Sequence, residues 1–208
     1  MKHNAIEPSQ GFVLHTYPYR ETSLIVEAFI REQGRMVFVA KGAKRPQSSM
    51  KGLLNPFQGL RLSWFGRAEM KTLKTVEHEI IYPQLSGAAL MSAFYMNELL
   101  LKLTHREDPH EAIFDAYTAA LNGLTGKAND RQAIPPLATT LRKFELSLLQ
   151  SLGFGLQLTE EAGTHQPLEV QKVYSYVIEQ GPIAVTRLNP YQRQLDGIKL
   201  AGKTLLDM

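Results

Sequence analysis

Residues 35–74 decide the fold of this chain, and they read RMVFVAKGAKRPQSSMKGLLNPFQGLRLSWFGRAEMKTLK. Three runs rich in apolar, β-branched or aromatic residues lie within this stretch, at Met36–Ala40, Gly59–Phe65 and Met70–Val76. Turns that carry glycine and proline separate the runs, which is the pattern of short antiparallel strands. The stretch therefore predicts a strand-rich core.

The same stretch is strongly basic. It contains nine Lys and Arg residues against one acid, Glu69, whereas the whole chain has a formal net charge of +3. A basic surface with interleaved rings, here Phe57, Trp64 and Phe65, suits a phosphate backbone and stacked bases. The candidate nucleic-acid contacts are the nine cations and one ring: Arg35, Lys41, Lys44, Arg45, Lys51, Arg61, Trp64, Arg67, Lys71 and Lys74. The alternative is an ordinary solvated basic face on a small barrel.

Five segments of residues 11–77 have strand-like composition. They are Gly11–Tyr17, Ser23–Ile30, Arg35–Lys41, Phe57–Phe65 and Ala68–Glu77. In the fourth, Leu60, Leu62 and Trp64 alternate with other residues and are expected on one face. Residues 42–52 lack apolar periodicity and are expected to form a mobile basic loop. Five short strands with one long loop predict a closed barrel of the oligonucleotide-binding (OB) kind over residues 1–80.

After Pro83 the apolar period changes from 2 to 3.6, which indicates helices. We predict helices over Ser86–Thr104, Asp108–Leu124 and Pro136–Leu152. Their buried faces are predicted at Leu90, Phe94, Leu99 and Leu103 in the first and at Leu137, Leu141, Phe144, Leu148 and Leu152 in the third. The remaining segments are predicted as a loop at Asn129–Pro136, irregular chain at Gly155–Val170, a hairpin at Val173–Val185 and weak helix at Pro190–Met208. The fold class is α+β: an N-terminal five-stranded OB barrel, then a mainly α-helical domain, residues 81–208, with a small β-hairpin.

Composition places the chain among globular proteins, with 44% hydrophobic and 21% charged residues. No apolar run is long enough for a membrane span, and the first ten residues do not resemble a secretory signal. The absence of cysteine fits a reducing compartment, so a cytoplasmic protein without membrane contact is expected. Residues 1–80 carry 12 Lys and Arg against 7 Asp and Glu, and residues 81–208 carry 11 against 13. This asymmetry predicts that the first part binds a polyanion and that the second part has another task.

Catalytic and metal-binding motifs are not recognisable. The six histidines are scattered, and His110-Glu111 lacks the second histidine of a zinc-protease helix. Gly153-Phe154-Gly155 follows a helix, where a helix-ending turn explains it better than a dinucleotide loop. No serine lies in a nucleophile elbow. The expectation is a protein that is not an enzyme, with no catalytic residue, metal or cofactor.

Two cations, Arg142 and Lys143, precede Phe144 on the otherwise apolar third predicted helix. One interpretation is a solvent-facing basic pair. The other is a cation beside a hydrophobic groove, which suits an acidic peptide that ends in an apolar anchor.

Six strings in order resemble the RecO family of bacterial DNA repair and recombination mediators. They are GFVLHTYPYRETSLIVEAF, GRMVFVAKGAKR, MKGLLNPF, GRAEMKTLK, MNELLLKL and LRKFELSLLQSLGFG, and they run through residues 11–155. The resemblance implies an OB domain followed by a helical domain. It also implies binding of single- and double-stranded DNA, annealing of complementary strands, partnership with RecR, and help in loading RecA onto DNA coated with single-strand-binding protein (SSB).

The resemblance also implies roles for particular residues. The family's basic DNA surface maps to Lys41, Lys44 and Arg45, and the arginine that helps to receive the acidic, Phe-ended SSB tail maps to Arg142. Lys143 and Phe144 complete the expected tail site, and a nucleoid-associated protein is implied. The alternative function is an OB-type adaptor that binds an acidic protein.

The sequence departs from the family in two respects. Many relatives carry four cysteines as a zinc module after the G-[FY]-G segment, and this chain has none, so Gly155–Val170 must be held in another way. Relatives also continue beyond the point that corresponds to Met208, and the helical domain is expected to be short at its C-terminus.

Overall fold

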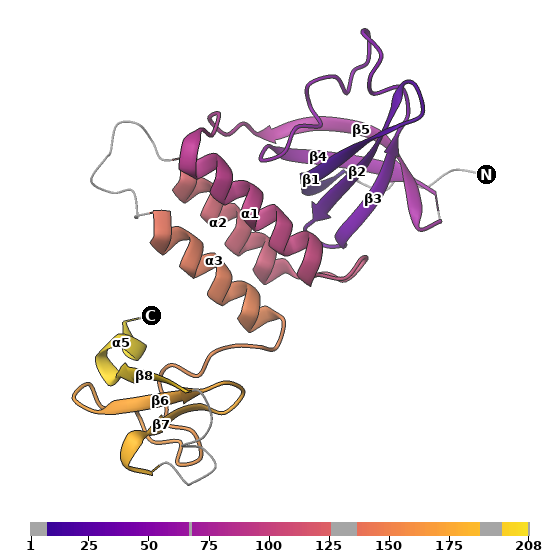
Figure 1. Ribbon diagram of the computed structural model, residues 1–208. Helices are drawn as coiled ribbons and strands as arrows, with labels where there is room; N and C mark the ends of the chain where they lie inside the picture. Colours follow the sequence, from indigo (N-terminus) through magenta and orange to yellow (C-terminus); the bar gives the residue numbers. More distant parts are fainter. Residues whose placement is uncertain (1–7, 67, 126–136, 188–196, 208) are drawn as a thin grey trace. The chain divides into compact units, whose positions relative to one another are not determined.

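The computed structural model describes residues 8–66, 68–125, 137–187 and 197–207. The chain divides into two compact units, Met1–Leu148 and Leu149–Met208. Each unit is described by itself below (Figure 1).

A closed five-stranded barrel opens the first unit, as the sequence predicted. Its strands are β1 (Ser9–Tyr19), β2 (Ser23–Ile30), β3 (Gly34–Ala40), β4 (Gly59–Phe65) and β5 (Met70–Ile80). The strand order is β1-β2-β3-β5-β4, with β4 returning to β1. All pairs are antiparallel except β3 with β5. β1 continues through Pro18, which pairs with Leu24, because β4 accompanies β1 only from Ser9 to Phe12 and the missing N–H of proline is tolerated on a free strand edge.

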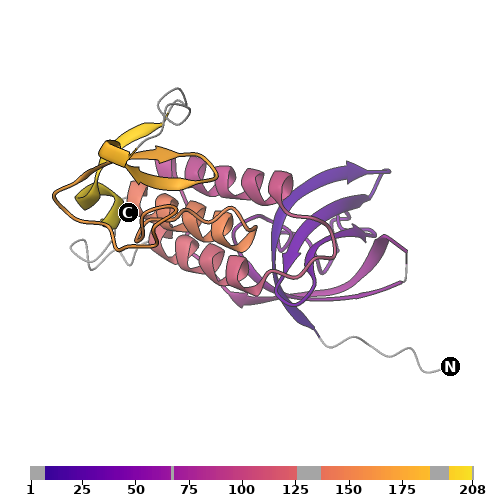
Figure 2. The ribbon, with the colours of Figure 1, turned by 90° about the horizontal axis from the view of Figure 1, so that it is seen from below.

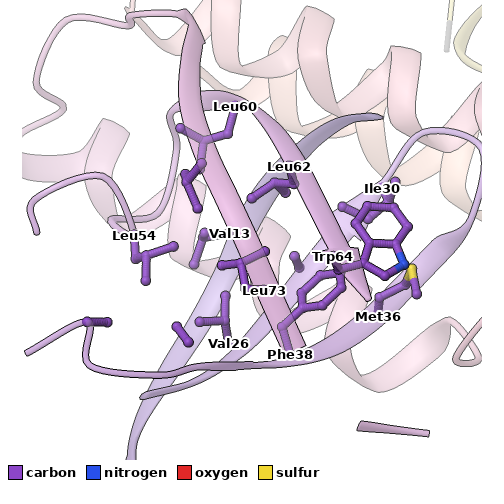
Figure 3. Close-up of a cluster of buried hydrophobic side chains, with 14 residues drawn as sticks. Val13, Val26, Ile30, Met36, Phe38, Leu54, Leu60, Leu62, Trp64 and Leu73 are labelled. Carbon is purple, nitrogen blue, oxygen red and sulfur yellow. The ribbon is translucent and has the colours of Figure 1, made fainter. Parts of the chain in front are cut away.

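The barrel interior is a cluster of buried apolar side chains (Figure 3). Leu60, Leu62 and Trp64 all belong to it, which confirms that they share one face. The Trp64 ring lies 5.2 Å from the Phe38 ring, between centroids. Burial of such aromatic and aliphatic side chains is the main stabilising term of a small barrel.

Three helices follow: α1 (Gly87–Leu103), α2 (Glu111–Thr125) and α3 (Leu137–Ser151). They lie side by side in Figures 1 and 2. The bounds of α1 and α3 agree with the sequence to within one residue, whereas α2 begins three residues after the predicted Asp108. Gly153 ends α3 with a φ of +85°, a backbone conformation that glycine adopts without strain. The predicted loop at Asn129–Pro136 lies outside the described residues.

The buried face of α1 was predicted wrongly. Phe94 and Leu103 are exposed and Leu90 and Leu99 are partly buried. The buried residues of the helix are Ser92, Ala93, Met96, Asn97 and Leu100. Because α1 is apolar on several sides, periodicity did not single out the stripe on which small and polar residues allow close packing.

Asn97 explains why a polar residue occupies that stripe. It is 2% exposed, its Nδ2 donates to the Leu14 carbonyl at 2.8 Å, and its Oδ1 accepts from the Tyr117 hydroxyl at 2.6 Å. The asparagine thus links α1 to β1 and to α2. Full burial raises the pKa of the Tyr117 hydroxyl far above its usual value, so this group donates as a neutral phenol.

Aromatic rings continue the contact between barrel and helices. Phe12 of β1 lies 5.3 Å from Phe114 and 5.1 Å from Tyr117, between ring centroids, and Tyr117 lies 6.1 Å from Phe144 of α3. The predicted face of α3 is confirmed at Phe144 and Leu148. Leu137, predicted on the same face, is exposed at the first turn.

The second unit contains a three-stranded sheet of order β7-β6-β8. Its elements are β6 (Val173–Val177), β7 (Gly181–Ala184), a 3-10 turn (Val185–Arg187), β8 (Ile198–Ala201) and α5 (Gly202–Leu206). The hairpin β6–β7 confirms the sequence. The weak helix predicted over Pro190–Met208 is corrected, because β8 pairs with β6 before the short α5 begins, and residues 188–196 lie outside the described residues.

Hydrogen bonds to β7 hold the irregular chain from Gly155 to Val170. The buried Glu161 carboxylate accepts from the Ala184 backbone N–H at 2.9 Å, and Ala162 N donates to the Pro182 carbonyl at 2.8 Å. Leu168 packs in a small core with Tyr174 and other residues of this unit. These contacts support the segment in which relatives were expected to carry cysteines.

Candidate nucleic-acid interface

The basic loop (residues 41–54) forms most of the connection from β3 to β4 and is a series of hydrogen-bonded turns. Lys44 N donates to the Thr22 carbonyl at 2.9 Å, which fastens the loop to the β1–β2 connection. Ala43 and Leu54 are buried in the barrel core at its two ends. The loop contains no helix or strand, as predicted. With its apolar residues held inward, its cations are exposed, and these are Lys41, Lys44, Arg45 and Lys51.

Two open hollows adjoin the loop. One, of about 600 Å³, is lined by residues of the β1–β2 connection and by Lys41 and Arg45. The other, of about 680 Å³, is formed by the loop itself and shares the same two cations. We call the first the basic hollow. One carboxylate, Glu21, also lines it, but neither Lys41 nor Arg45 forms an ion pair with a described residue, so the hollow is a candidate site for an anion.

Arg20 is a cation of the basic hollow that sequence reasoning missed. Its guanidinium lies 5.2 Å from the centroid of the Tyr19 ring, and its φ of 52° marks the tight β1–β2 turn. Cation–π contact of this kind orients a guanidinium while leaving its donors free. The signal available in the sequence was a cation in the short Arg20-Glu21-Thr22 segment between the first two predicted strands.

Arg35 and Lys71, both predicted as DNA contacts, form ion pairs within the protein and do not line the basic hollow. Arg35 lies 3.6 Å from the buried Glu27 carboxylate and donates to the Thr104 carbonyl at 3.0 Å. Lys71 forms an ion pair with Glu107. Both side chains are partly buried in these contacts, so they hold the segment after α1 against the barrel. Glu107 is 36 residues from Lys71, and Thr104 is 69 residues from Arg35, so these contacts were not visible in the sequence. Glu27 is close to Arg35 in the sequence, on the paired strand β2, but its burial was not predicted.

The remaining candidate cations are dispersed. Arg61 on β4 is half-exposed, 3.6 Å from Glu79, and Lys74 is exposed on β5. Arg67 lies outside the described residues. Neither Arg61 nor Lys74 lines the basic hollow.

Base stacking on Trp64, predicted from the sequence, is corrected. The Trp64 side chain is 4% exposed inside the barrel, and Phe57 is 8% exposed. The alternation that gives β4 its buried face also directs the indole inward, so one residue cannot serve both purposes. Phe65, at 48%, is the ring of the predicted set that remains exposed.

The predicted peptide-binding residues of α3 face three different directions. Arg142 is exposed, with Nη1 3.0 Å from Glu145 Oε2, and the Tyr95 hydroxyl donates to the same carboxylate at 2.8 Å. This hydrogen bond is the main reason that the pKa of Tyr95 is raised. Lys143 lines a groove of about 260 Å³ between α2 and α3, walled by small residues of α2. Phe144 is 1% exposed and forms the floor of that groove as a core residue, not a free ring.

The described residues contain no group of three or more His, Cys, Asp or Glu side chains placed to hold a metal ion. None of the helices in the described ranges is long and apolar enough to cross a membrane.

The geometry defines a class of protein: an OB-type barrel that presents an exposed cationic loop and packs against a layer of helices. Comparisons identify the family. The model described as "Recombination protein O N terminal" matches residues 5–81, and "Recombination protein O C terminal" matches residues 84–201. The chain therefore belongs to the RecO family.

Individual relatives agree over nearly the whole chain. "DNA repair protein RecO" of Aromatoleum aromaticum is 46% identical over 203 residues, which is 98% of this chain and 80% of that protein. The protein of the same name from Nitrosospira multiformis is 46% identical over 97% of this chain and 79% of its own length. The two family models meet after β5, whereas the compact units divide after Leu148, within α3. The domain boundary at residue 80 stays a prediction.

Proposed function

We propose that this chain is a non-catalytic mediator of DNA repair and recombination that binds single- and double-stranded DNA. The observation that carries the proposal is the basic loop. Lys41, Lys44, Arg45 and Lys51 are exposed there, and none forms an ion pair with a residue that the structure describes. The names of the relatives, which are DNA repair proteins, support the same assignment.

Binding follows from charge neutralisation. Each phosphate that meets a cation releases condensed counterions, so affinity falls as salt rises. Four loop cations with Arg20 give four or five contacts, and at about −0.7 per contact the log–log salt slope for single strands is roughly −3. Annealing follows from the same charge, because cations that screen two phosphate backbones lower the repulsion between strands.

Recruitment to SSB-coated DNA is the task we propose for the helices of the first unit. Arg142 is an exposed cation on α3, and the groove beside Lys143 has an apolar floor at Phe144. An acidic peptide that ends in an apolar residue would find both features there. With RecR as partner, the bound protein would then assist the loading of RecA.

The proposal is tested by the triple substitution of Lys41, Lys44 and Arg45 with alanine. Removing three phosphate contacts should reduce the salt slope for single-stranded DNA by about 2, measured by fluorescence anisotropy across a salt series. The matched control removes three lysines that lie outside the interface, Lys102, Lys199 and Lys203, and should leave the slope unchanged. Equal slopes in the two triple variants would show that net charge, and not the basic loop, governs binding.

A wild-type protein that stays folded but binds no oligonucleotide even at low ionic strength would contradict the proposal altogether. That outcome would favour the alternative of an adaptor for an acidic protein, which requires the same cations but no DNA.

A further inference from the structure

A β-bulge gives β1 an outward-facing row of rings. The register with β2 shifts between Val13, which pairs with Ala28, and His15, which pairs with Glu27. Val13 lies in the barrel core, and without the shift residues of the same parity would also face inward. The bulge instead places His15, Tyr17 and Tyr19 on the outer face. We call these three residues the aromatic row.

The rings of this row are accessible. Tyr17 is 46% exposed and its ring centroid lies 4.4 Å from that of His15, in an edge-on arrangement. Tyr19 is two residues further along the strand, a backbone rise of about 6.8 Å in an antiparallel strand. The Arg20 guanidinium lies over its ring. The row therefore ends at the basic hollow, of which Tyr19 is a wall.

Beside the row lies another hollow, of about 470 Å³, on the same outer face. Tyr17, Ile25, Val37 and Met70 give it apolar walls, and Glu27, Glu69 and Arg106 complete it. Arg106 forms ion pairs with both carboxylates, with Nη2 3.0 Å from Glu27 Oε1 and Nη1 2.7 Å from Glu69 Oε1. Arg35, which lies behind the lining, is 3.6 Å from the other oxygen of Glu27, so two guanidiniums balance the two carboxylates and no cation is left for a phosphate. We therefore call it the neutral hollow.

From this juxtaposition we propose that the aromatic row is a stacking surface for the bases of single-stranded DNA, and that one base enters the neutral hollow against Tyr17. The proposal rests on the DNA binding proposed above and adds where the bases lie. The phosphates follow the basic hollow, where cations are unpaired, and an uncharged planar ring is the part of a nucleotide that suits the neutral hollow. Stacking of this kind tolerates any base, since every base has a π-face.

The test compares an oligodeoxythymidylate with an abasic oligonucleotide of the same length, which has the same phosphates but no bases. The wild type should bind the base-bearing strand more tightly. Tyr17→Ala should lose roughly 5- to 150-fold of that affinity, the effect of removing one stacking ring, and keep its affinity for the abasic strand and its salt slope. Tyr17→Phe retains the ring and should behave as wild type.

Two further variants sharpen the result. Phe65→Ala removes the exposed ring of β4, and Phe154→Ala removes a ring that is 70% exposed in the second unit. Neither should change the preference for bases. If Tyr17→Ala keeps the full preference, or if Phe65→Ala abolishes it, the aromatic row is not the stacking surface.

Failure of the DNA-binding proposal itself gives a different result from failure of the stacking proposal. In that case the wild type binds neither strand, whereas loss of the stacking surface alone leaves abasic binding intact. Circular dichroism of Tyr17→Ala guards against misfolding, which is not expected because the side chain is half in solvent.

Discussion

The buried hydrogen bond between Asn97 and Tyr117 predicts that Tyr117→Phe destabilises the wild type but stabilises the Asn97→Ala variant. Asn97→Ala removes the acceptor of the Tyr117 hydroxyl and the donor to the Leu14 carbonyl, and all three groups are buried. An orphaned buried polar group costs about 1–3 kcal/mol, so two orphans cost about 2–6 kcal/mol. That is a large part of the roughly 5–15 kcal/mol by which a protein is stable.

Tyr117→Phe alone removes one hydrogen bond and orphans Asn97 Oδ1, at about 1–3 kcal/mol. In the Asn97→Ala background the same change has the opposite effect. There the hydroxyl is already without its partner in a fully buried site, so deleting it removes a desolvated group and should raise the free energy of unfolding. The coupling in the double-mutant cycle is then about 2 kcal/mol or more.

Urea unfolding followed by tryptophan fluorescence measures this cycle in the full chain. Trp64 is the one tryptophan and lies in the barrel of the same unit as Asn97, so its emission reports the relevant transition. With a slope of about 1–3 kcal/mol per molar urea, a change of 2 kcal/mol moves the midpoint by roughly 1 M. Asn122→Ala, at an exposed position of α2, is the control and should move it little. If Tyr117→Phe costs as much in Asn97→Ala as in the wild type, the reasoning is refuted.

Two further predictions concern ligand contact. Because Trp64 is buried in the barrel, saturation with oligothymidylate should leave its emission nearly unquenched; strong quenching would mean that a base reaches the indole. Arg142→Ala should weaken binding of an acidic peptide with a C-terminal phenylalanine and leave binding of naked DNA unchanged, as measured by titration with each ligand. Lys102→Ala, at an exposed site of α1, is the control and should change neither. Loss of binding to both ligands in Arg142→Ala would indicate unfolding.

The barrel could be predicted from the sequence because its information is local. Leu60, Leu62 and Trp64 recur with the period of a strand, and the Gly- and Pro-bearing turns fix where strands end. The same locality explains the main error in the site. Trp64 was used both as part of a buried face and as a base-stacking ring, although alternation allows only one of these.

What could not be predicted depends on partners that are distant in sequence. Lys71 pairs with Glu107, 36 residues away, and Arg35 donates to the carbonyl of Thr104, 69 residues away, so neither contact can be read from the neighbouring sequence. The bulge between Val13 and His15 is equally hidden, because β1 reads as a plausible strand with or without it. The stripe of α1 that contains Asn97 was missed because the helix has apolar residues on several sides, and a buried polar residue is recognised only when its partners are known.

The ion pairs around Glu27 divide the cations of the basic stretch into those with a carboxylate partner and those without one. Burying a carboxylate is costly unless cations accompany it, and here Arg35 and Arg106 do so, while Arg106 also binds Glu69. Two acids and two bases cancel on the outer face of the barrel, beside Tyr17. The loop from Lys41 to Lys51 has no such acids, and its charge stays uncompensated among the described residues. A strand of DNA laid across this face would therefore meet positive charge at the loop and a neutral, ring-lined surface next to it. The first suits the phosphates of the strand, and the second suits its uncharged bases.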